Sequence, residues 1–174
     1  VFGGSTGSAS ALTETFDGTS ATEVGDLNTA RYVNGSASQV NTAALSFGGY
    51  TTTYVANTES WDGSSWTEVS DLNNTRGYNS GAGTSTNAIS ISGEPSPRNY
   101  VENWDGTSWT EVAEINTARA QGGCSNFGPN DSVIYFGGEP GSQTTTEFWN
   151  GTSWTELNDL GTARTTPGGA GTTV

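Results

Sequence analysis

The chain has no histidine, no lysine and no methionine, and its only cysteine is Cys124. Without histidine there is no Ser-His-Asp or Cys-His arrangement and no imidazole ligand for a metal. One cysteine excludes an internal disulfide, and its small neighbours predict a buried thiol, with a reactive or cross-linking thiol as the alternative. No apolar run is long enough to span a bilayer as a helix. We therefore expect a protein that is not an enzyme, carries no metal or cofactor and does not insert into membranes.

Positive charge is also scarce, because five arginines stand against 18 acidic residues and give a net charge of −13. A surface this acidic repels phosphate backbones and anionic membranes, so we do not expect a nucleic acid as a partner. An acidic, lysine-free surface rich in Thr and Asn suits a solvent-exposed or salt-rich setting. The first residues, Val1 to Gly4, include neither a methionine nor a basic segment, which is the pattern expected of a processed piece or a fragment.

One nine-residue stretch, Trp-Asp-Gly-Thr-Ser-Trp-Thr-Glu-Val in its third copy, is written four times with small changes. Its copies start at Phe16, Trp61, Trp104 and Trp149, with spacings of 45, 43 and 45 residues. A period of about 44 residues is typical of propellers and solenoids. The Asp-Gly or Asn-Gly pair between the aromatics predicts a hairpin turn. The first copy has Phe16 and Ala21 in place of the tryptophans, so its unit is predicted to be the most loosely packed.

Each repeat reads as four short strands. An arginine opens the unit and is followed by a strand of small residues, such as residues 79–85. A short apolar strand ending in glycine comes next, such as residues 133–138, and the third and fourth strands flank the hairpin turn. Four antiparallel strands joined by tight turns form the blade of a β-propeller. Small residues suit the innermost strand, where backbones crowd around a narrow axis, and no helix is expected.

The two ends of the chain supply parts of one further unit. Residues 1–4, Val-Phe-Gly-Gly, match the end of a second strand, and residues 169–174 match a first strand. Pairing of these terminal strands would close a ring and remove its open edges. We therefore predict one domain, residues 1–174, with four blades formed by residues 163–174 plus 1–26, 30–71, 75–114 and 118–159. A monomeric ring is preferred, and an eight-bladed ring of two chains or a larger propeller remains open.

The order of these features resembles the kelch repeat. An arginine, a small-residue strand, an apolar strand ending in Gly-Gly and two aromatics recur, as in Arg119, residues 133–138, Trp149 and Trp154. The resemblance covers essentially the whole chain and implies an all-β, four-bladed kelch-like β-propeller. Kelch propellers usually have six or seven blades, and the third unit here has Ser-Gly at residues 92–93. The uniform turn looks like repeats of phage and marine bacterial surface proteins.

The repeated charges have two interpretations. The arginines are predicted to ring one mouth of the axis, where they could bind a carboxylate, a sulfate or a sugar acid. Alternatively, each pairs with the acid five residues upstream. The four pairs, upstream acid first, are Asp26 with Arg31, Asp71 with Arg76, Glu114 with Arg119 and Asp159 with Arg164.

The repeated glutamates and tryptophans are interpreted as structural. Paired carboxylates can perform acid–base chemistry or bind Ca²⁺, but a catalytic pair is needed once rather than in every unit. A solvated outer face is therefore predicted for Glu14, Glu59, Glu102 and Glu147 before the turn and Glu23, Glu68, Glu111 and Glu156 after it. Because aromatics dominate cores, the tryptophans are predicted to pack inside the blades rather than to stack on sugars.

Function is sought in residues that do not repeat. The loops after the glycines differ, and Tyr50, Tyr54, Arg98 and Tyr100 form the most ligand-like set, expected on the same face as the arginines. The leading hypothesis is a non-enzymatic recognition propeller on an extracellular or virion surface, with a glycan or protein ligand. The alternative is a structural decoration or spacer of a larger assembly, such as a phage tail or capsid. A glycan hydrolase using the non-repeated acids is a third hypothesis.

Overall fold

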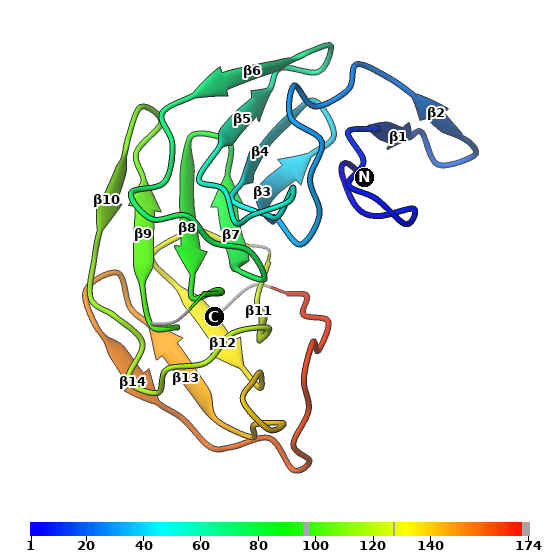
Figure 1. Cartoon of the computed structure of the whole chain (residues 1–174). Helices are drawn as coiled ribbons and strands as arrows, with labels where there is room; N and C mark the ends of the chain where they lie inside the picture. Colours follow the sequence, from blue (N-terminus) through cyan, green and yellow to red (C-terminus); the bar gives the residue numbers. More distant parts are fainter. Residues whose placement is uncertain (96–97, 127, 172–174) are drawn as a thin grey trace.

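The computed structural model describes residues 1–95, 98–126 and 128–171, and in this part of the chain all regular structure is β. The strands form antiparallel sheets that stand side by side around an arc (Figure 1). The prediction of an all-β fold is confirmed, and no helix of the described residues is long and apolar enough to cross a membrane. The repeat units defined by the sequence each correspond to one sheet.

The first unit has two strands and the next three units have four each. The first unit contains β1 (Glu14–Phe16) and β2 (Ala21–Glu23). The second contains β3 (Gly35–Val40), β4 (Ala43–Phe47), β5 (Thr58–Trp61) and β6 (Trp66–Val69). The third contains β7 (Ser80–Thr84), β8 (Asn87–Ile91), β9 (Val101–Trp104) and β10 (Trp109–Glu111). The fourth contains β11 (Gly123–Cys124), β12 (Val133–Phe136), β13 (Thr146–Trp149) and β14 (Trp154–Glu156).

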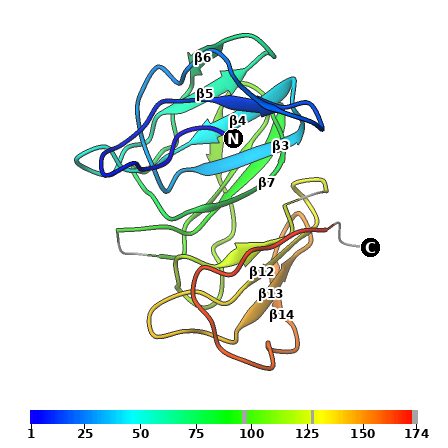
Figure 2. The same ribbon diagram turned by 90° about the vertical axis from the view of Figure 1, so that its right-hand side faces the viewer.

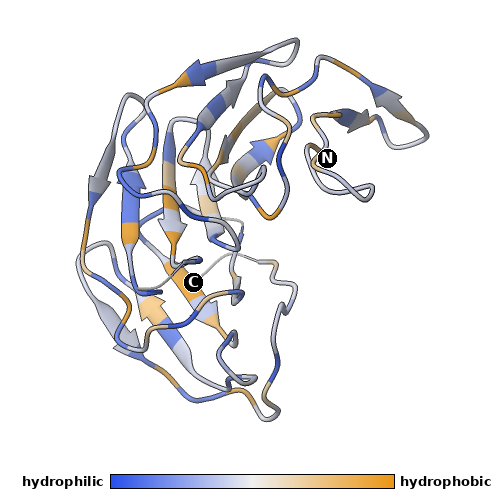
Figure 3. Ribbon diagram, viewed as in Figure 1, coloured by the Kyte–Doolittle hydropathy of each residue, from blue (hydrophilic) through white to orange (hydrophobic). Residues whose placement is uncertain are grey.

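The first strands of neighbouring units approach each other on the concave side of the arc (Figure 1). A Cβ atom on Gly81 would lie 2.3 Å from the Ser36 carbonyl oxygen of the preceding unit. One on Gly169 would lie 2.0 Å from the carbonyl oxygen of Cys124. No side chain fits at such distances, which explains the small-residue strands. Figure 3 shows the complementary pattern, with hydrophobic residues concentrated in middle strands such as β8 and β12.

The tryptophans are buried, as predicted, and they pack between units as well as within them. In each four-stranded unit the two rings that flank the turn lie 5.4 Å apart, centroid to centroid. The second ring of the pair also packs edge-on against the preceding unit, because Trp66 contacts Phe2 at 4.7 Å and Trp109 contacts Phe47 at 4.9 Å. The first unit lacks both tryptophans, and its Phe16 is 62 % exposed. The prediction that this unit is the most loosely packed is confirmed.

The first unit and the tail lie on either side of the opening in the arc (Figures 1 and 2). The tail, residues 163–171, lies against the fourth unit, where the Thr166 N–H donates to the Gln121 carbonyl at 2.9 Å. The first unit lies against the second, where the Gly4 N–H donates to the Arg31 carbonyl at 2.9 Å. Within the described ranges no hydrogen bond joins the first unit to the tail. The predicted terminal pairing is therefore not seen among the described residues, and residues 172–174 of the predicted strand lie outside them.

The Asp-Gly turn is held by its own carboxylate. Asp105 accepts hydrogen bonds from the backbone N–H groups of Thr107 and Ser108 at 2.8 and 2.9 Å, while Gly106 takes a φ of 98°. The Thr107 hydroxyl, followed by these N–H groups, lowers the pKa of Asp105 to about 2. In the fourth unit, the Asn150 side-chain oxygen accepts the two equivalent backbone hydrogen bonds without a charge.

The lowered pKa predicts an acid-dependent contribution to stability. Since the folded pKa of Asp105 lies below its usual value of about 3.9, the charged turn stabilises the fold above about pH 4 and loses this effect as the pH falls toward about 2. Asp105→Asn should therefore weaken the acid dependence of the free energy of unfolding in urea, and Asn150→Asp should strengthen it. Identical pH profiles for both variants and the parent chain would contradict this interpretation.

Candidate functional site

Three of the four repeated arginines lie in buried ion pairs. The Arg31 guanidinium lies 3.2 Å from the Glu59 carboxylate, and both side chains are almost fully buried. Arg76 pairs with Glu102, and Arg119 pairs with Glu147, in the same way. Each pair joins the residue that opens a unit to the third strand of the same unit. These guanidinium groups therefore face a carboxylate inside the protein rather than an open mouth.

The predicted positions of the acids need two corrections. A solvated outer face is wrong for Glu59, Glu102 and Glu147, which are buried, and right for Glu14 and for the four glutamates after the turn, which are exposed. Pairing of arginines with the acids five residues upstream is wrong. Those acids accept hydrogen bonds elsewhere: Asp26 from the Thr13 N–H, Asp71 from the Thr58 N–H, Glu114 from the Asn99 amide and Asp159 from the Thr144 hydroxyl.

An asparagine completes each buried pair and explains the sequence that precedes each arginine. Asn28 donates to Glu59 from its backbone N–H at 2.7 Å and from its side chain at 2.9 Å. Asn73 and Asn116 donate to Glu102 and Glu147 in the same way. Burial lowers the pKa of Arg31 and Arg76, and the facing glutamate opposes this shift. Because each charge is paired inside one unit, we assign the three pairs to the fold.

Breaking one pair should be strongly destabilising. Glu102→Gln leaves the Arg76 guanidinium buried without a countercharge, and the free energy of unfolding should fall by about 3 kcal/mol or more. Glu111→Gln, at an exposed position of the same unit, is the control and should change stability by less than about 0.5 kcal/mol. Urea unfolding followed by tryptophan fluorescence measures both. Equal losses in the two variants would contradict a structural role for the pair.

A group of tyrosines lies in the loops of the second unit. The Tyr32 and Tyr50 rings are 5.4 Å apart, the Tyr50 and Tyr54 rings are 5.2 Å apart, and all three side chains are half-buried. Tyr32 and Tyr50 also exchange backbone hydrogen bonds at 3.1 and 2.9 Å. Tyr54 packs against Gly77 of the third unit, where an added Cβ would lie 3.1 Å from the Tyr54 ring. The neighbouring Tyr78 helps to raise the pKa of Tyr54. We call Tyr32, Tyr50, Tyr54 and Tyr78 the tyrosine cluster.

An ion pair lies beside this cluster. The Arg98 guanidinium is 2.5 Å from the Glu94 carboxylate, and 27 % of the Arg98 side chain is exposed. Partial burial raises the pKa of Tyr54, and Glu94 adds to this shift while Arg98 opposes it, so both charges act on that hydroxyl. The structure thus brings together Tyr50, Tyr54 and Arg98 of the predicted set. It separates Tyr100, whose carbonyl accepts a hydrogen bond from Arg76 at 3.1 Å beside another hollow.

The residues two positions after the repeated arginines lie together in a row, which we call the mouth. Val33, Tyr78, Gln121 and Thr166 all have a φ between 44° and 59°, a left-handed conformation that is uncommon outside glycine. Their backbones are linked in series: Tyr78 N–H to Val33 O, Gln121 N–H to Tyr78 O, and Thr166 N–H to Gln121 O, at 2.7, 3.3 and 2.9 Å. They line a hollow of about 250 Å³. Tyr78 belongs to both the mouth and the tyrosine cluster.

Sequence reasoning left Tyr32, Tyr78 and Glu94 out of the ligand-like set, although the loop that contains Glu94 was expected on this face. The available signal was that Tyr32 and Tyr78 interrupt the repeat just after Arg31 and Arg76, where other units carry different residues. Arg164, the last of the repeated arginines, is exposed, and its Nε donates to the Thr162 carbonyl at 3.3 Å. Among the predicted binding arginines, Arg164 and Arg98 therefore have exposed atoms.

The described residues offer neither a reactive thiol nor a cluster of metal ligands. Cys124 is buried, and burial raises its pKa to about 12, which confirms the prediction of an unreactive buried thiol. No group of three or more Asp, Glu, Cys or His side chains in the described ranges could hold a metal ion. The tyrosine cluster with its ion pair is thus the best-developed candidate site.

Comparison of the sequence with protein-family models gives no match, and comparison with curated proteins gives none either. The resemblance to the kelch repeat therefore rests on the residues quoted above. Function has to be argued from the geometry of the chain itself.

Proposed function

We propose that this chain is a four-bladed, kelch-like β-propeller that recognises a glycan or a protein through the tyrosine cluster, on an extracellular or virion surface and without catalysis. The observation that carries the proposal is the cluster itself. Tyr32, Tyr50 and Tyr54 stand in ring contact, all half-buried, and Tyr78 and the Glu94–Arg98 pair act electrostatically on the Tyr54 hydroxyl. No equivalent group recurs in the repeat, so the fold does not require it.

The chemistry of the cluster suits recognition. Tyrosine offers a large, rigid apolar ring with a polar tip, a combination enriched at binding surfaces. The hydrogen bonds of the described residues involve none of the phenolic hydroxyls of the cluster, so these groups are free to bond a ligand. The adjacent ion pair adds charged donors and acceptors. With a net charge of −13 on the chain, a neutral or basic ligand is favoured over a polyanion.

Ring closure, the second part of the proposal, is supported by unmatched charges at the two ends of the arc. Arg164 and Glu14 occupy the repeat positions of the three buried ion pairs, yet both are exposed. Closure would bring them together as the fourth pair. The series of backbone hydrogen bonds at the mouth is incomplete in the same way. A fourth bond, from the Val33 N–H to the Thr166 carbonyl, would complete it.

Apolar surfaces at the two ends also match. At the interface between the first two units, Trp61 packs in one cluster with Phe2 and Val24. The repeat equivalents of Trp61 and Val24 at the open ends are Phe16 and Leu157, which are 62 % and 42 % exposed. Closure would bury these two side chains against each other. A bond across the axis, from the Gln39 amide to the Gly128 carbonyl at 3.2 Å, shows that the arc is already narrow.

A double-mutant cycle tests closure. If Phe16 and Leu157 touch, the losses in unfolding free energy for Phe16→Ser and Leu157→Ser should fail to add, with a coupling energy of about 0.5 kcal/mol or more. Sedimentation shows whether the closed species is a monomer. Additive losses in a monomer would indicate an open arc. Coupling that depends on protein concentration would indicate a ring of two chains.

Binding to glycan and peptide arrays tests recognition. Tyr50→Ala and Tyr54→Ala should each weaken the binding of any captured ligand by at least about tenfold, since truncation of a central aromatic costs about 2 kcal/mol. Tyr100→Ala is the matched control, because Tyr100 lies outside the cluster, and it should leave affinity unchanged. If the folded chain captures no ligand at millimolar concentration, recognition is overturned and the structural spacer is favoured.

A further inference from the structure

The hairpin turn of the fourth unit carries an amide where the other three turns carry a carboxylate. Asn150 stands at the repeat position of Asp17, Asp62 and Asp105, and glycine follows each of the four residues. In the three acidic turns, hydrogen bonds from the turn residues lower the pKa of the aspartate to about 2, so these side chains are ionised at neutral pH. Asn150 is the uncharged member of the set.

The turn bends the Asn150 side chain back over the peptide that follows it. Its Oδ1 accepts hydrogen bonds from the backbone N–H groups of Thr152 and Ser153, both at 2.9 Å. These two donors lie beyond Gly151 in the chain, so a side chain that reaches them must pass over the Asn150–Gly151 peptide bond. The bend therefore brings the amide carbon Cγ toward the Gly151 nitrogen.

The same hydrogen bonds prepare this amide for attack by that nitrogen. They polarise the side-chain carbonyl, and they place two donors where negative charge develops when a nucleophile adds to Cγ, as in an oxyanion hole. Among the described residues, no hydrogen bond uses the Asn150 Nδ2 or the Gly151 N–H. Gly151 has no Cβ to obstruct the approach. Asn150 is exposed, so water reaches the site.

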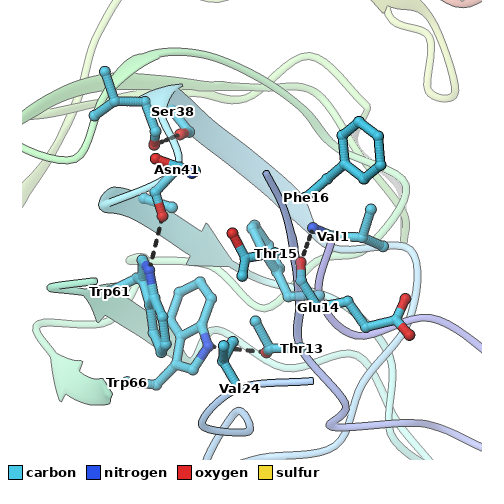
Figure 4. A pocket seen from close by; sticks show the side chains of 13 residues that line it. Val1, Thr13, Glu14, Thr15, Phe16, Val24, Ser38, Asn41, Trp61 and Trp66 are labelled. Atoms are coloured by element: carbon cyan, nitrogen blue, oxygen red, sulfur yellow. Dashed lines mark hydrogen bonds between the residues drawn. The ribbon is translucent and has the colours of Figure 1, made fainter. Parts of the chain in front are cut away.

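The stem of the hairpin holds the turn in place. Trp149 and Trp154 pair across it, both are buried, and their ring centroids are 5.4 Å apart. Figure 4 shows the equivalent pair of the second unit, Trp61 and Trp66, which lie together in the same way. The reacting groups are thus positioned by the fold, which is how proximity and orientation accelerate an intramolecular reaction.

We propose that Asn150 is a site of spontaneous covalent modification, at which the turn converts its own asparagine into aspartate with water as the only co-reactant. The Gly151 nitrogen forms a bond to Cγ and gives up its proton. The Cγ–Nδ2 bond breaks, and Nδ2 leaves with that proton as ammonia. Water then opens the cyclic imide. Cleavage of its N–Cγ bond gives aspartate, and cleavage of its other carbonyl C–N bond gives the β-linked isomer. No atom changes its oxidation state.

The chain contains a second Asn-Gly pair, Asn34-Gly35, that lacks these features. The Asn34 Nδ2 donates to the Ser46 hydroxyl at 3.0 Å. Gly35 is buried in β3, where it pairs with Phe47. The leaving amide is therefore engaged elsewhere, and the nitrogen of the glycine is fixed in a strand. This pair should stay unmodified while the chain is folded, which makes it an internal control.

The modification is independent of the proposed function. The turn joins β13 to β14 in the outer hairpin of the fourth unit, whereas the tyrosine cluster lies in the second and third units. Formation of aspartate makes the net charge more negative by one and gives the fourth unit the charged turn of the other units. Failure of either proposal leaves the other standing.

Peptide mapping of the whole chain by mass spectrometry tests the proposal. During incubation in mildly alkaline buffer, the fragment that contains Asn150 should gain about 1 Da, the difference between an amide and a carboxylic acid. It should do so at least about tenfold faster than the fragment that contains Asn34. In guanidinium chloride, which unfolds the chain, the two fragments should react at similar rates. Equal rates in the folded chain, or slower reaction of Asn150 in the folded chain than in denaturant, would overturn the proposal.

Asp105→Asn provides the second arm, because it creates an Asn-Gly turn in the third unit with backbone donors at the equivalent positions. The residue that faces the glycine of the turn is Thr86 in the third unit and Asp131 in the fourth, so a shared rate assigns the reaction to the turn itself. The new asparagine should convert within about threefold of the rate at Asn150. If it stays intact in a chain whose urea midpoint shows that it is folded, the turn does not promote the reaction and the proposal is wrong.

Discussion

The buried arginine–glutamate pair is the interaction on which each of the three four-stranded units depends. It joins the residue that opens the unit to the third strand, and the asparagine three residues before the arginine holds the same carboxylate. A chain with so few aliphatic residues has little apolar surface with which to fix its strands. A charged pair out of water is costly when broken, so it fixes one arrangement of strands and loops. Three of the five arginines are used in this way.

Packing between units is the second constraint, and it determines where the chain has open surface. Each tryptophan pair is covered by the second-strand side chains of the unit before it, as Phe47 covers Trp109. Where that cover is partial, at the first unit, a hollow remains over Trp61 and Trp66. Where a unit is followed by the tail instead of another sheet, Leu157 remains exposed. The open surfaces are therefore consequences of the repeat rather than of local composition.

The repeat made much of the fold predictable from the sequence. The turn, the strand order and the buried tryptophans follow from short-range patterns that recur from one copy of the repeat to the next. The partner of each arginine could not be predicted, because the upstream acid and the third-strand glutamate recur with the same period. Choosing between them requires the position of the third strand relative to the arginine in the folded chain, which the repeat period does not give. For the same reason, Tyr32 and Tyr78 were missed, since Tyr32 pairs with Tyr50 and Tyr78 bonds Val33 through backbone contacts that no periodicity reveals.

Closure of the ring, as proposed, would give Arg164, Glu14, Phe16 and Leu157 the contacts that their repeat equivalents already make. A crystal structure of the monomeric chain tests it most directly. The account predicts that the Arg164 guanidinium faces the Glu14 carboxylate in a fourth buried pair and that the tail strand lies beside Phe2. Arg164 and Glu14 far apart and hydrated, or paired with those of a second molecule, would contradict it.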